Sequence, residues 1–361
     1  MLKVCIIGCG MISRSAHIPA YLYHSKYYEI TAVCDCSQES AKKTAQEFGI
    51  KNYYSDVETM LKEQSPDVVS VCSPNMSHKE NVILSLKYGA NVLCEKPLAF
   101  NYKDAKEMFD LAKKQNKVLM ACQTARFMPE RRKAFELKQS GLLGDVYFAE
   151  VSRIRRRGIP TWGKFHLKEY SGGGALVDIG VHILDSAIWL MDNPKPLSVT
   201  ANTLKVHTNE LGSAKGSGAL KENVEIKKFD PDEMNVESFA SGLVKFENGA
   251  SLSFKVSWAA NLKEANNIVL SGEKAGIDTE NCIIFEGENG ITEYKPEPEK
   301  LRDEAFFGHF YVIENFAEVL TLGKEPIIKP EETINVSAIL EAAYLSVDNN
   351  REIFLEELKN D

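Results

Sequence analysis

The sequence predicts an α/β protein of two domains: an N-terminal doubly wound parallel sheet, and a C-terminal α+β domain with an open, largely antiparallel sheet. The length of 361 residues corresponds to two domains at roughly 150 residues each. Short Val- and Ile-rich runs alternate with helical patterns over residues 1–122. From residue 123 to 361 the pattern changes to one helix, several strand-like segments and two closing helices.

The N-terminal domain is expected to alternate strands and helices. Its apolar runs lack strict alternation, as is typical of strands buried on both faces of a parallel sheet. The expected strands are residues 3–7, 30–34, 51–54, 68–72, 91–94 and 118–121. The expected helices are residues 12–24, 38–48, 57–63, 79–88 and 102–116. Ser37, Asp56, Ser77 and Asn101 are expected N-caps, and Gly49 and Gly89 are expected to end helices.

The C-terminal domain is expected to contain a helix at 130–139, a strand at 146–155 and a helix at 175–191. Asn248-Gly249 predicts a hairpin between strands at 243–246 and 252–258. Residues 207–237 are polar and turn-rich, and we expect them to form a surface excursion. Closing helices are expected at 310–321 and 331–348, the last of which belongs here or packs back on the first domain.

Composition excludes several classes of protein. Apolar residues make up 44% and charged residues 26%, as in an ordinary globular protein. No run of about 18 apolar residues occurs, so no membrane-spanning helix is expected. The net charge of −8 provides no electrostatic surface for nucleic acid or anionic lipid. A strand begins at once without a signal peptide, and the eight cysteines are expected to be reduced thiols, which favours a cytoplasmic protein.

A glycine-rich turn follows the first expected strand. It reads Gly8-Cys9-Gly10-Met11-Ile12-Ser13 and opens the first helix. Gly8 permits a tight turn, Gly10 lets the backbone approach a pyrophosphate, and the helix N-terminus at Met11 and Ile12 supplies N–H donors. Ser13 stands where the dinucleotide motif has a third small residue. A plain strand–helix turn is the alternative interpretation.

Asp35 ends the second expected strand, where such folds place a carboxylate that binds the adenosine ribose. It would accept hydrogen bonds from both ribose hydroxyls and repel a 2′-phosphate. Cys36 follows, so no adjacent arginine neutralises such a phosphate, although Lys42 and Lys43 lie one or two helical turns away. We therefore expect NAD rather than NADP as cofactor.

Several motifs in order resemble the Gfo/Idh/MocA oxidoreductases, the family of glucose–fructose oxidoreductase and inositol dehydrogenase. They are Gly8-x-Gly10, Ser73-Pro74-Asn75-x-x-His78, the Glu95-Lys96-Pro97 run and Gly173-Gly174 followed by Asp178, His182 and Asp185. The resemblance covers essentially the whole chain. It implies a Rossmann domain, a nicotinamide cofactor, hydride transfer at a sugar or polyol carbon, and a homodimer or homotetramer formed through the second domain's sheet.

The resemblance also implies roles for individual residues. Lys96 matches the catalytic lysine, and Asp178 and His182 match the acid–base pair. Ser73, Asn75, His78 and Glu95 match positions around the nicotinamide and its ribose. The peptide bond before Pro97 is expected to be cis.

The chemistry agrees with these roles. Asp178 and His182 are four residues apart on one helix face. We expect His182 to be the general base, Asp178 to orient it or accept from a substrate hydroxyl, and Lys96 to stabilise the developing alkoxide. A proton relay through Lys96 and a mere surface pair are the alternatives. Asp185 lies one turn further along the same helix face, so the spacing of Asp178, His182 and Asp185 also permits a metal site. No further ligand is evident nearby and hydride transfer needs no metal, so we expect none.

Arginines crowd the end of the strand at 146–155, namely Arg153, Arg155, Arg156 and Arg157. We expect Arg126, Arg156 and Trp162 to contact the substrate. The arginines would bind an anion or sugar hydroxyls, and Trp162 would stack on a sugar ring. A solvated or subunit-contact patch is equally compatible, and Arg126 is also expected to mark the domain crossover. His17 and His166 are expected to be packing or surface residues.

The sequence therefore predicts an NAD-dependent oxidoreductase acting on a hydroxyl-bearing carbon of a sugar, a cyclic polyol or a sugar derivative. Three alternatives stay open: a redox-assisted NAD-dependent glycosidase, a non-catalytic NAD-binding regulatory protein, and a dehydrogenase of a non-sugar carbonyl.

Overall fold

The computed structural model describes residues 1–160, 164–206, 233–287, 290–295 and 306–359. The chain forms two compact units. Unit 1 comprises Met1–Ala99, Lys103–Thr124 and Arg302–Thr333, and unit 2 comprises Phe100–Tyr102, Ala125–Leu301 and Ile334–Asp361. Apart from the short stretch Phe100–Tyr102, the chain first leaves unit 1 between Thr124 and Ala125, beside Arg126 and close to the predicted boundary at residue 122.

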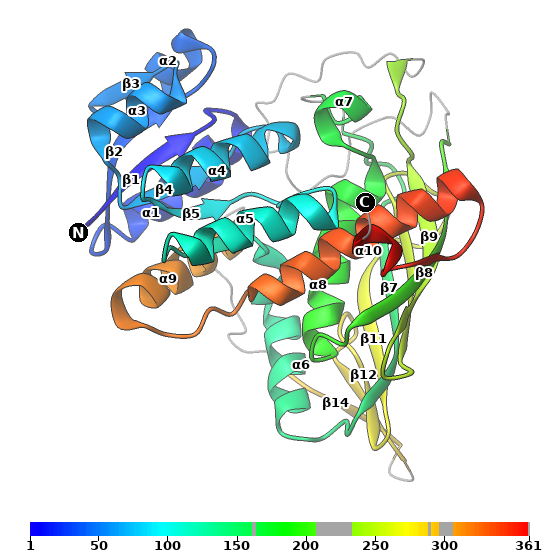
Figure 1. Ribbon diagram of the computed structural model, residues 1–361. Coiled ribbons are helices and arrows are strands. Elements are labelled where there is room, and N and C mark those ends of the chain that lie inside the picture. The colour runs from blue at the N-terminus through cyan, green and yellow to red at the C-terminus, as the bar shows by residue number, and fades with distance from the viewer. Residues whose placement is uncertain (161–163, 207–232, 288–289, 296–305, 360–361) are drawn as a thin grey trace. The chain divides into compact units, whose positions relative to one another are not determined.

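Unit 1 contains a parallel sheet, sheet A, in the strand order β3-β2-β1-β4-β5-β6 (Figure 1). Its strands are β1 (Leu2–Ile7), β2 (Tyr28–Cys34), β3 (Asn52–Tyr54), β4 (Val68–Val71), β5 (Asn91–Cys94) and β6 (Leu119–Ala121). Each predicted strand is confirmed to within two residues at either end. β1 pairs with β2 on one side and β4 on the other, so the chain reverses its winding there, and ligands bind at the carboxyl ends of strands at such a point.

The helices of unit 1 follow the predicted order. A helical run over residues 11–23 contains a π-helical segment, η1 (Ser13–His17), and α1 (Ile18–Tyr23). The others are α2 (Gln38–Phe48), α3 (Val57–Gln64), the short η2 (Asn75–Ser77), α4 (His78–Lys87) and α5 (Tyr102–Lys114). The side chains of Ser37 and Asp56 accept capping bonds from Ser40 N and Thr59 N, as predicted, whereas Ser77 makes no side-chain cap.

A late segment returns to unit 1, which differs from its predicted place in the second domain. Its helix α9 (Phe307–Leu322) packs against η1 and α1. His24 Nε2 meets Phe310 O at 3.0 Å, and the Tyr28 hydroxyl donates to Ile313 O at 3.0 Å. These buried contacts place α9 in the core of unit 1.

Unit 2 contains a nine-stranded sheet, sheet B, in the order β14-β13-β12-β11-β7-β10-β9-β8-β15 (Figure 1). Its strands are β7 (Val146–Ile154), β8 (Pro196–Leu204), β9 (Phe239–Phe246), β10 (Ser251–Ser257), β11 (Ala265–Gly272), β12 (Ala275–Asp278), β13 (Ile283–Glu286), β14 (Gly290–Glu293) and β15 (Ile353–Phe354). The β10–β7 pair is parallel, and the other pairs are antiparallel. The largely antiparallel sheet and the hairpin at Gly249 are confirmed.

The helices of unit 2 are η3 (Thr124–Phe127, from the unit boundary), α6 (Pro129–Gln139), α7 (Lys168–Ser171), η4 (Leu176–Gly180), α8 (Val181–Leu190), most of α10 (Pro330–Asn349) and η7 (Glu357–Lys359). α8 contacts α6, β7 and β11, so it lies on one face of sheet B. By length and hydropathy Lys168–Leu190 is long and apolar enough to cross a membrane, but 89% of that window is buried inside the protein, as in a core helix.

The predicted surface excursion is partly wrong. Residues 207–232 lie outside the described residues. The last part of the segment enters the core, because Met234 and Val236 are buried and Glu237 is only 8% exposed. The carboxylate of Glu237 bonds the start of a core helix, which accounts for the burial of this polar end.

Candidate functional site

The glycine turn after β1 has the geometry that a dinucleotide pyrophosphate requires. Gly8 has a φ of +95°, and a Cβ there would lie 2.6 Å from Cys72 O, so no larger residue fits. A Cβ at Gly10, by contrast, would meet no described atom within 4 Å. Gly10 therefore leaves an open approach to the first turn of the helix at Met11 and Ile12, whose N–H groups favour an anion.

Asp35 connects this turn to the end of β2. Its Oδ2 accepts from Cys9 N at 2.8 Å, and its Oδ1 accepts from Ser37 N at 2.9 Å. The Cys36 thiol also faces Oδ1, at 3.7 Å, whereas Oδ2 keeps a second lone pair, so the group can still accept from a ribose hydroxyl. Cys36 beside it is exposed.

The loops after β4 and β5 are joined by His78. One ring nitrogen lies 2.8 Å from Pro97 O and the other 3.0 Å from Ser73 O. Ser73 Oγ accepts from Asn81 Nδ2 at 3.0 Å, and Asn75 begins η2 half-buried. His78 is buried with both nitrogens engaged by the backbone, so it shapes the loops, while its predicted contact with the cofactor stays a prediction.

Glu95 and Lys96 follow β5. Glu95 is buried, and its Oε1 lies 2.8 Å from His17 Nε2 and 3.1 Å from His309 Nε2. Its Oε2 accepts from Lys96 N at 3.1 Å. Burial alone would raise the pKa of Glu95, but the two histidines beside its carboxylate hold that pKa well below its usual value. Glu95 thus fixes the backbone at Lys96, which is half-buried, and the Lys96–Pro97 bond is cis, as expected.

His17 was expected to be an ordinary packing or surface residue. It is fully buried, and besides Glu95 it contacts Ser70 Oγ at 2.8 Å through Nδ1. No local sequence pattern links His17, Glu95 and His309, because His17 and His309 lie 78 and 214 positions from Glu95.

Asp178 and His182 stand out on the core helix of unit 2. Asp178 and His182 are half-buried. All the remaining residues from 173 to 191, a stretch that the structure describes in full, are buried. Asp178 lies in the π-helical η4 and His182 in the first turn of α8. The two polar side chains are therefore the part of this helix that reaches solvent.

Trp258 fixes the carboxylate of Asp178. The indole Nε1 donates to Asp178 Oδ2 at 2.9 Å, and Trp258 itself is fully buried. The sequence showed Trp258 only as the last apolar position of the second hairpin strand. A buried tryptophan N–H usually has a hydrogen-bond acceptor, so a polar partner for Trp258 could have been expected from the sequence.

Glu237 holds the start of the same helix. Its carboxylate accepts from Gly174 N at 2.9 Å, Leu176 N at 3.0 Å and the Tyr344 hydroxyl at 2.9 Å. Burial raises the pKa of Glu237, and these hydrogen bonds oppose the shift. A Cβ at Gly174 would lie 1.8 Å from Glu237 O and one at Gly173 2.1 Å from the Tyr344 oxygen, so the glycine run permits this contact.

Arg126 and Asp185 form a fully buried ion pair. The guanidinium donates to both carboxylate oxygens, at 2.7 and 2.6 Å. This geometry gives both residues a structural role and leaves the alternative of a metal at Asp185 without support. The predicted contact of Arg126 with substrate stays a prediction.

Among the clustered arginines, Arg153 interacts electrostatically with Asp178. Burial lowers the pKa of Arg153 to about 10, neighbouring Arg155 and Arg131 add to this, and the Asp178 carboxylate opposes it. Arg156, the arginine expected to bind substrate, is exposed, and its backbone N donates to Glu264 Oε1 at 3.2 Å. Trp162 lies outside the described residues.

The predicted residues thus form two groups. Gly8, Gly10, Asp35, Ser73 and Lys96 follow strands β1, β2, β4 and β5 at the carboxyl edge of sheet A. Asp178 and His182 belong to unit 2. A meeting of Lys96 with His182 over a nicotinamide stays a prediction.

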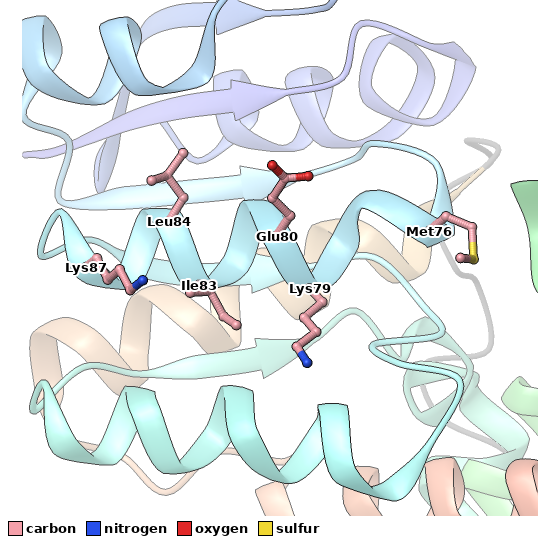
Figure 2. A pocket seen from close by; sticks show the side chains of 6 residues that line it. All are labelled: Met76, Lys79, Glu80, Ile83, Leu84 and Lys87. Atoms are coloured by element: carbon pink, nitrogen blue, oxygen red, sulfur yellow. The ribbon is translucent and has the colours of Figure 1, made fainter.

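A hollow of about 410 Å³ lies elsewhere, along α4. Figure 2 shows its lining side chains, all from this helix and the turn before it: Met76, Lys79, Glu80, Ile83, Leu84 and Lys87. Lys79 pairs with Asp104 at 2.5 Å and Glu107 at 2.6 Å, so its charge is engaged. The hollow contains none of the predicted site residues.

The chain matches two family models. The oxidoreductase family with an NAD-binding Rossmann fold matches residues 2–123, and the GFO/IDH/MocA C-terminal domain matches residues 131–278. A D-glucoside 3-dehydrogenase of Escherichia coli is 36% identical over 291 residues, which cover 80% of each chain. A levoglucosan dehydrogenase of Pseudarthrobacter phenanthrenivorans is 26% identical over 67% of this chain and 66% of its own.

Solved structures share the whole fold. An oxidoreductase from Agrobacterium radiobacter, in complex with NAD+, L-tartaric acid and magnesium, has a TM-score of 0.80 at 22% identity and covers 99% of both chains. A levoglucosan dehydrogenase in complex with NADH and levoglucosan has a TM-score of 0.79 at 20% identity and covers 98% of both. With both family models in chain order over most of its length, the chain belongs to the Gfo/Idh/MocA family of NAD-binding oxidoreductases.

Proposed function

We propose that the protein oxidises a secondary hydroxyl of a sugar ring, with a D-glucoside as the first candidate substrate and NAD+ as the hydride acceptor. The observation that carries this proposal is the Asp178–His182 pair, which alone reaches solvent on an otherwise buried helix, with Asp178 fixed by Trp258. The 36% identity to a D-glucoside 3-dehydrogenase supports the substrate class.

The residues of this chain divide the chemistry between them. A nicotinamide, when bound, accepts the hydride from the carbinol carbon. His182 takes the hydroxyl proton as the carbonyl forms, and Asp178 orients the ring or holds a neighbouring sugar hydroxyl. The ammonium of Lys96 stabilises negative charge that develops on the oxygen. Gly8 and Gly10 admit the pyrophosphate, and the helix that starts at Met11 donates to it.

NAD is the preferred cofactor in this proposal. The Asp35 carboxylate would lie against the 2′ position of the adenosine ribose, where it accepts from a hydroxyl and repels a phosphate. Cys36 is the next residue and carries no compensating positive charge. Asp35→Ser should relax the preference, measured as the ratio of kcat/KM with NAD+ and NADP+.

The test is a screen of NAD+ reduction, followed by absorbance of NADH, across glucosides, inositols, aldoses, sugar phosphates and uronic acids. We expect net NADH formation with a glucoside and a keto-sugar as product. His182→Ala and Lys96→Ala should each lower kcat by at least about a hundredfold and leave the Kd for NAD+ nearly unchanged. Aglycone release without net NADH would instead identify a redox-assisted glycosidase. Protein that binds NAD+ but reduces it with none of these compounds contradicts the proposal.

We further propose that the protein forms a homo-oligomer through the open face of sheet B. Three apolar residues on that face, Leu204, Leu243 and Phe285, are 51%, 37% and 40% exposed in the isolated chain. Burying such side chains stabilises association. Light scattering should give a dimer or tetramer mass that Leu243→Glu reduces, and a monomeric wild-type protein contradicts the proposal.

A further inference from the structure

Four side chains with metal-binding atoms converge in the interior of unit 1. They are His17 of η1, Glu95 after β5, Cys122 after β6 and His309 of α9. All four are buried, and one ligand atom from each lies within 4.8 Å of all the others. Glu95 directly precedes Lys96 and was matched to the cofactor region, whereas His17, Cys122 and His309 have no predicted role in the reaction.

The contacts of His309 favour a positive charge in the cluster, because a carboxylate faces its second ring nitrogen. Its Nδ1 faces the carbonyl oxygen of Phe306 at 3.2 Å, and a carbonyl only accepts, so Nδ1 carries the hydrogen. In the neutral ring, Nε2 then presents a lone pair. That lone pair faces Glu95 Oε1, a second acceptor, at 3.1 Å. Only a cation or an additional proton between the two atoms makes this contact favourable.

His17 points at the same oxygen. Its Nε2 lies 2.8 Å from Glu95 Oε1, and its Nδ1 lies 2.8 Å from Ser70 Oγ. When Nδ1 donates to the Ser70 hydroxyl, Nε2 presents a lone pair, so His17 can bind a metal ion through Nε2. The thiol of Cys122 is fully buried and supplies the fourth donor of the cluster.

We propose that His17, Glu95, Cys122 and His309 bind one divalent transition-metal ion, with zinc as the best match. Two imidazoles, a carboxylate and a thiolate form a four-coordinate donor set that zinc prefers, and the two anionic ligands balance its charge in the interior. Ser70 and the Phe306 carbonyl hold the outer ring nitrogens, as the partners of metal-bound histidines do. Four protein donors leave no position open, so the ion is structural.

The geometry needs little adjustment. Zinc bonds of about 2.0–2.3 Å place tetrahedral donors roughly 3.3–3.6 Å apart. The two nitrogen–oxygen distances of 2.8 and 3.1 Å therefore have to lengthen by less than about 1 Å. The ion would join α9, which comes late in the chain, to the first helix and to β5 and β6.

The test measures metal binding without any activity assay. Full-length protein from zinc-supplemented medium should contain about one zinc per chain by mass spectrometry. Protein stripped with a chelator should have a lower Tm, which zinc restores. Cobalt added to the stripped protein should give a thiolate-to-cobalt charge-transfer band in the near ultraviolet and the visible bands of a tetrahedral site.

Variants identify the ligands. Cys122→Ser should remove the charge-transfer band, and His309→Gln should weaken zinc binding at least about a hundredfold. Cys36→Ser, an exposed cysteine outside the cluster, is the matched control and should retain both signals. If His309→Gln does not fold, the cobalt spectra of wild type and Cys122→Ser still show whether the cluster binds a metal ion. Stripped wild-type protein that shows neither a cobalt band nor a rise in Tm with zinc overturns the proposal, as does a band that survives Cys122→Ser.

Discussion

The carboxylate of Asp178 is held by the indole of Trp258. A carboxylate in a helix can adopt several rotamers, and the indole of Trp258 selects one by donating at 2.9 Å. The hydrogen bond is to a charged group, which makes it worth about 1.5–3 kcal/mol. A residue proposed to take part in the reaction is thus positioned by a residue just after β10, 80 positions away.

Trp258→Phe keeps the ring in the core and removes the donor. We expect kcat to fall roughly tenfold to a hundredfold, because 1.4 kcal/mol corresponds to a factor of ten, with the Kd for NAD+ unchanged. Trp189→Phe is the matched control, since Trp189 is buried on α8 and stacks on Phe135. Steady-state kinetics of both variants check this, and equal losses in the two would show that Trp258 acts through packing alone.

The cysteines differ sharply in reactivity. Burial raises the pKa of Cys5 and Cys9 to about 11 and that of Cys34 to about 12, so these thiols stay protonated. Cys36 is exposed, with its sulfur 3.7 Å from Asp35 Oδ1. We expect a thiol reagent to label Cys36 first, and saturating NAD+ to slow that labelling because the adenosine ribose would lie beside it. Peptide mapping after brief labelling checks both, and NAD+ that leaves the rate unchanged argues against ribose binding at Asp35.

At the scale of elements, two helices contain a feature that periodicity did not predict. Residues 12–24 and 175–191 were expected to be ordinary helices, and these bounds are right to within a residue or two. Each contains a five-residue π-helical segment, η1 with His17 and η4 with Asp178. A π-helical segment of this length lies within an otherwise regular helix and has no hydrophobic pattern of its own. Hydrophobic periodicity therefore does not distinguish it from the α-helix around it.

Polar composition misled the prediction for the segment that ends at Glu237. A polar, turn-rich stretch is normally exposed, and the whole of 207–237 was assigned to the surface on that basis. Glu237 is buried because Gly174 N, Leu176 N and the Tyr344 hydroxyl satisfy it, and those donors come from distant parts of the chain. Sequence composition reports average exposure, not the partners that allow one carboxylate to be buried.

The glycine turn offers a test at the same scale, because its two glycines have different constraints. Gly8→Ala would place a methyl group 2.6 Å from Cys72 O at a φ of +95° and should lower the Tm strongly. Gly10→Ala meets no described atom within 4 Å, so we expect a Tm close to wild type. The same methyl group would occupy the approach to the pyrophosphate, so the Kd for NAD+ should rise at least about tenfold.

Calorimetric unfolding and NAD+ titration of both variants measure the two effects. Gly49→Ala is a control for strain without ligand proximity, since Gly49 has a φ of +68° at the end of α2. A Gly10→Ala protein that binds NAD+ as tightly as the wild type would show that the cofactor does not approach this turn.

For the whole molecule, local patterns predicted the strands of sheet A and most helices, because apolar runs and caps are local properties. They could not predict that residues 302–333 return to unit 1. An apolar helix such as α9 looks the same in sequence whichever core receives it. Its place is decided by complementary contacts, such as those of His24 and Tyr28 with its backbone carbonyls, which involve residues about 285 positions away.

The pH dependence of stability tests whether the buried ring of His78 is neutral or charged in the folded protein. Both ring nitrogens of His78 face carbonyl oxygens, at 2.8 and 3.0 Å, a geometry that an imidazolium satisfies best. Burial opposes the charge and lowers the pKa of His78, although the two carbonyls and Glu95 favour the charged ring. We expect burial to prevail, because desolvating an ion costs more than one hydrogen bond returns.

In that case the unfolded chain binds a proton at His78 below pH 6.5 while the folded protein does not. The contribution of His78 to stability is therefore complete above pH 6.5 and is lost as the pH falls from there toward the lowered pKa. Denaturant unfolding of wild type and His78→Gln between about pH 7.5 and 5 isolates this effect, with a difference in slope of at most about 1.4 kcal/mol per pH unit. If wild type instead gains stability relative to His78→Gln as the pH falls, the ring is charged in the folded protein, and the two carbonyls rather than burial determine its state.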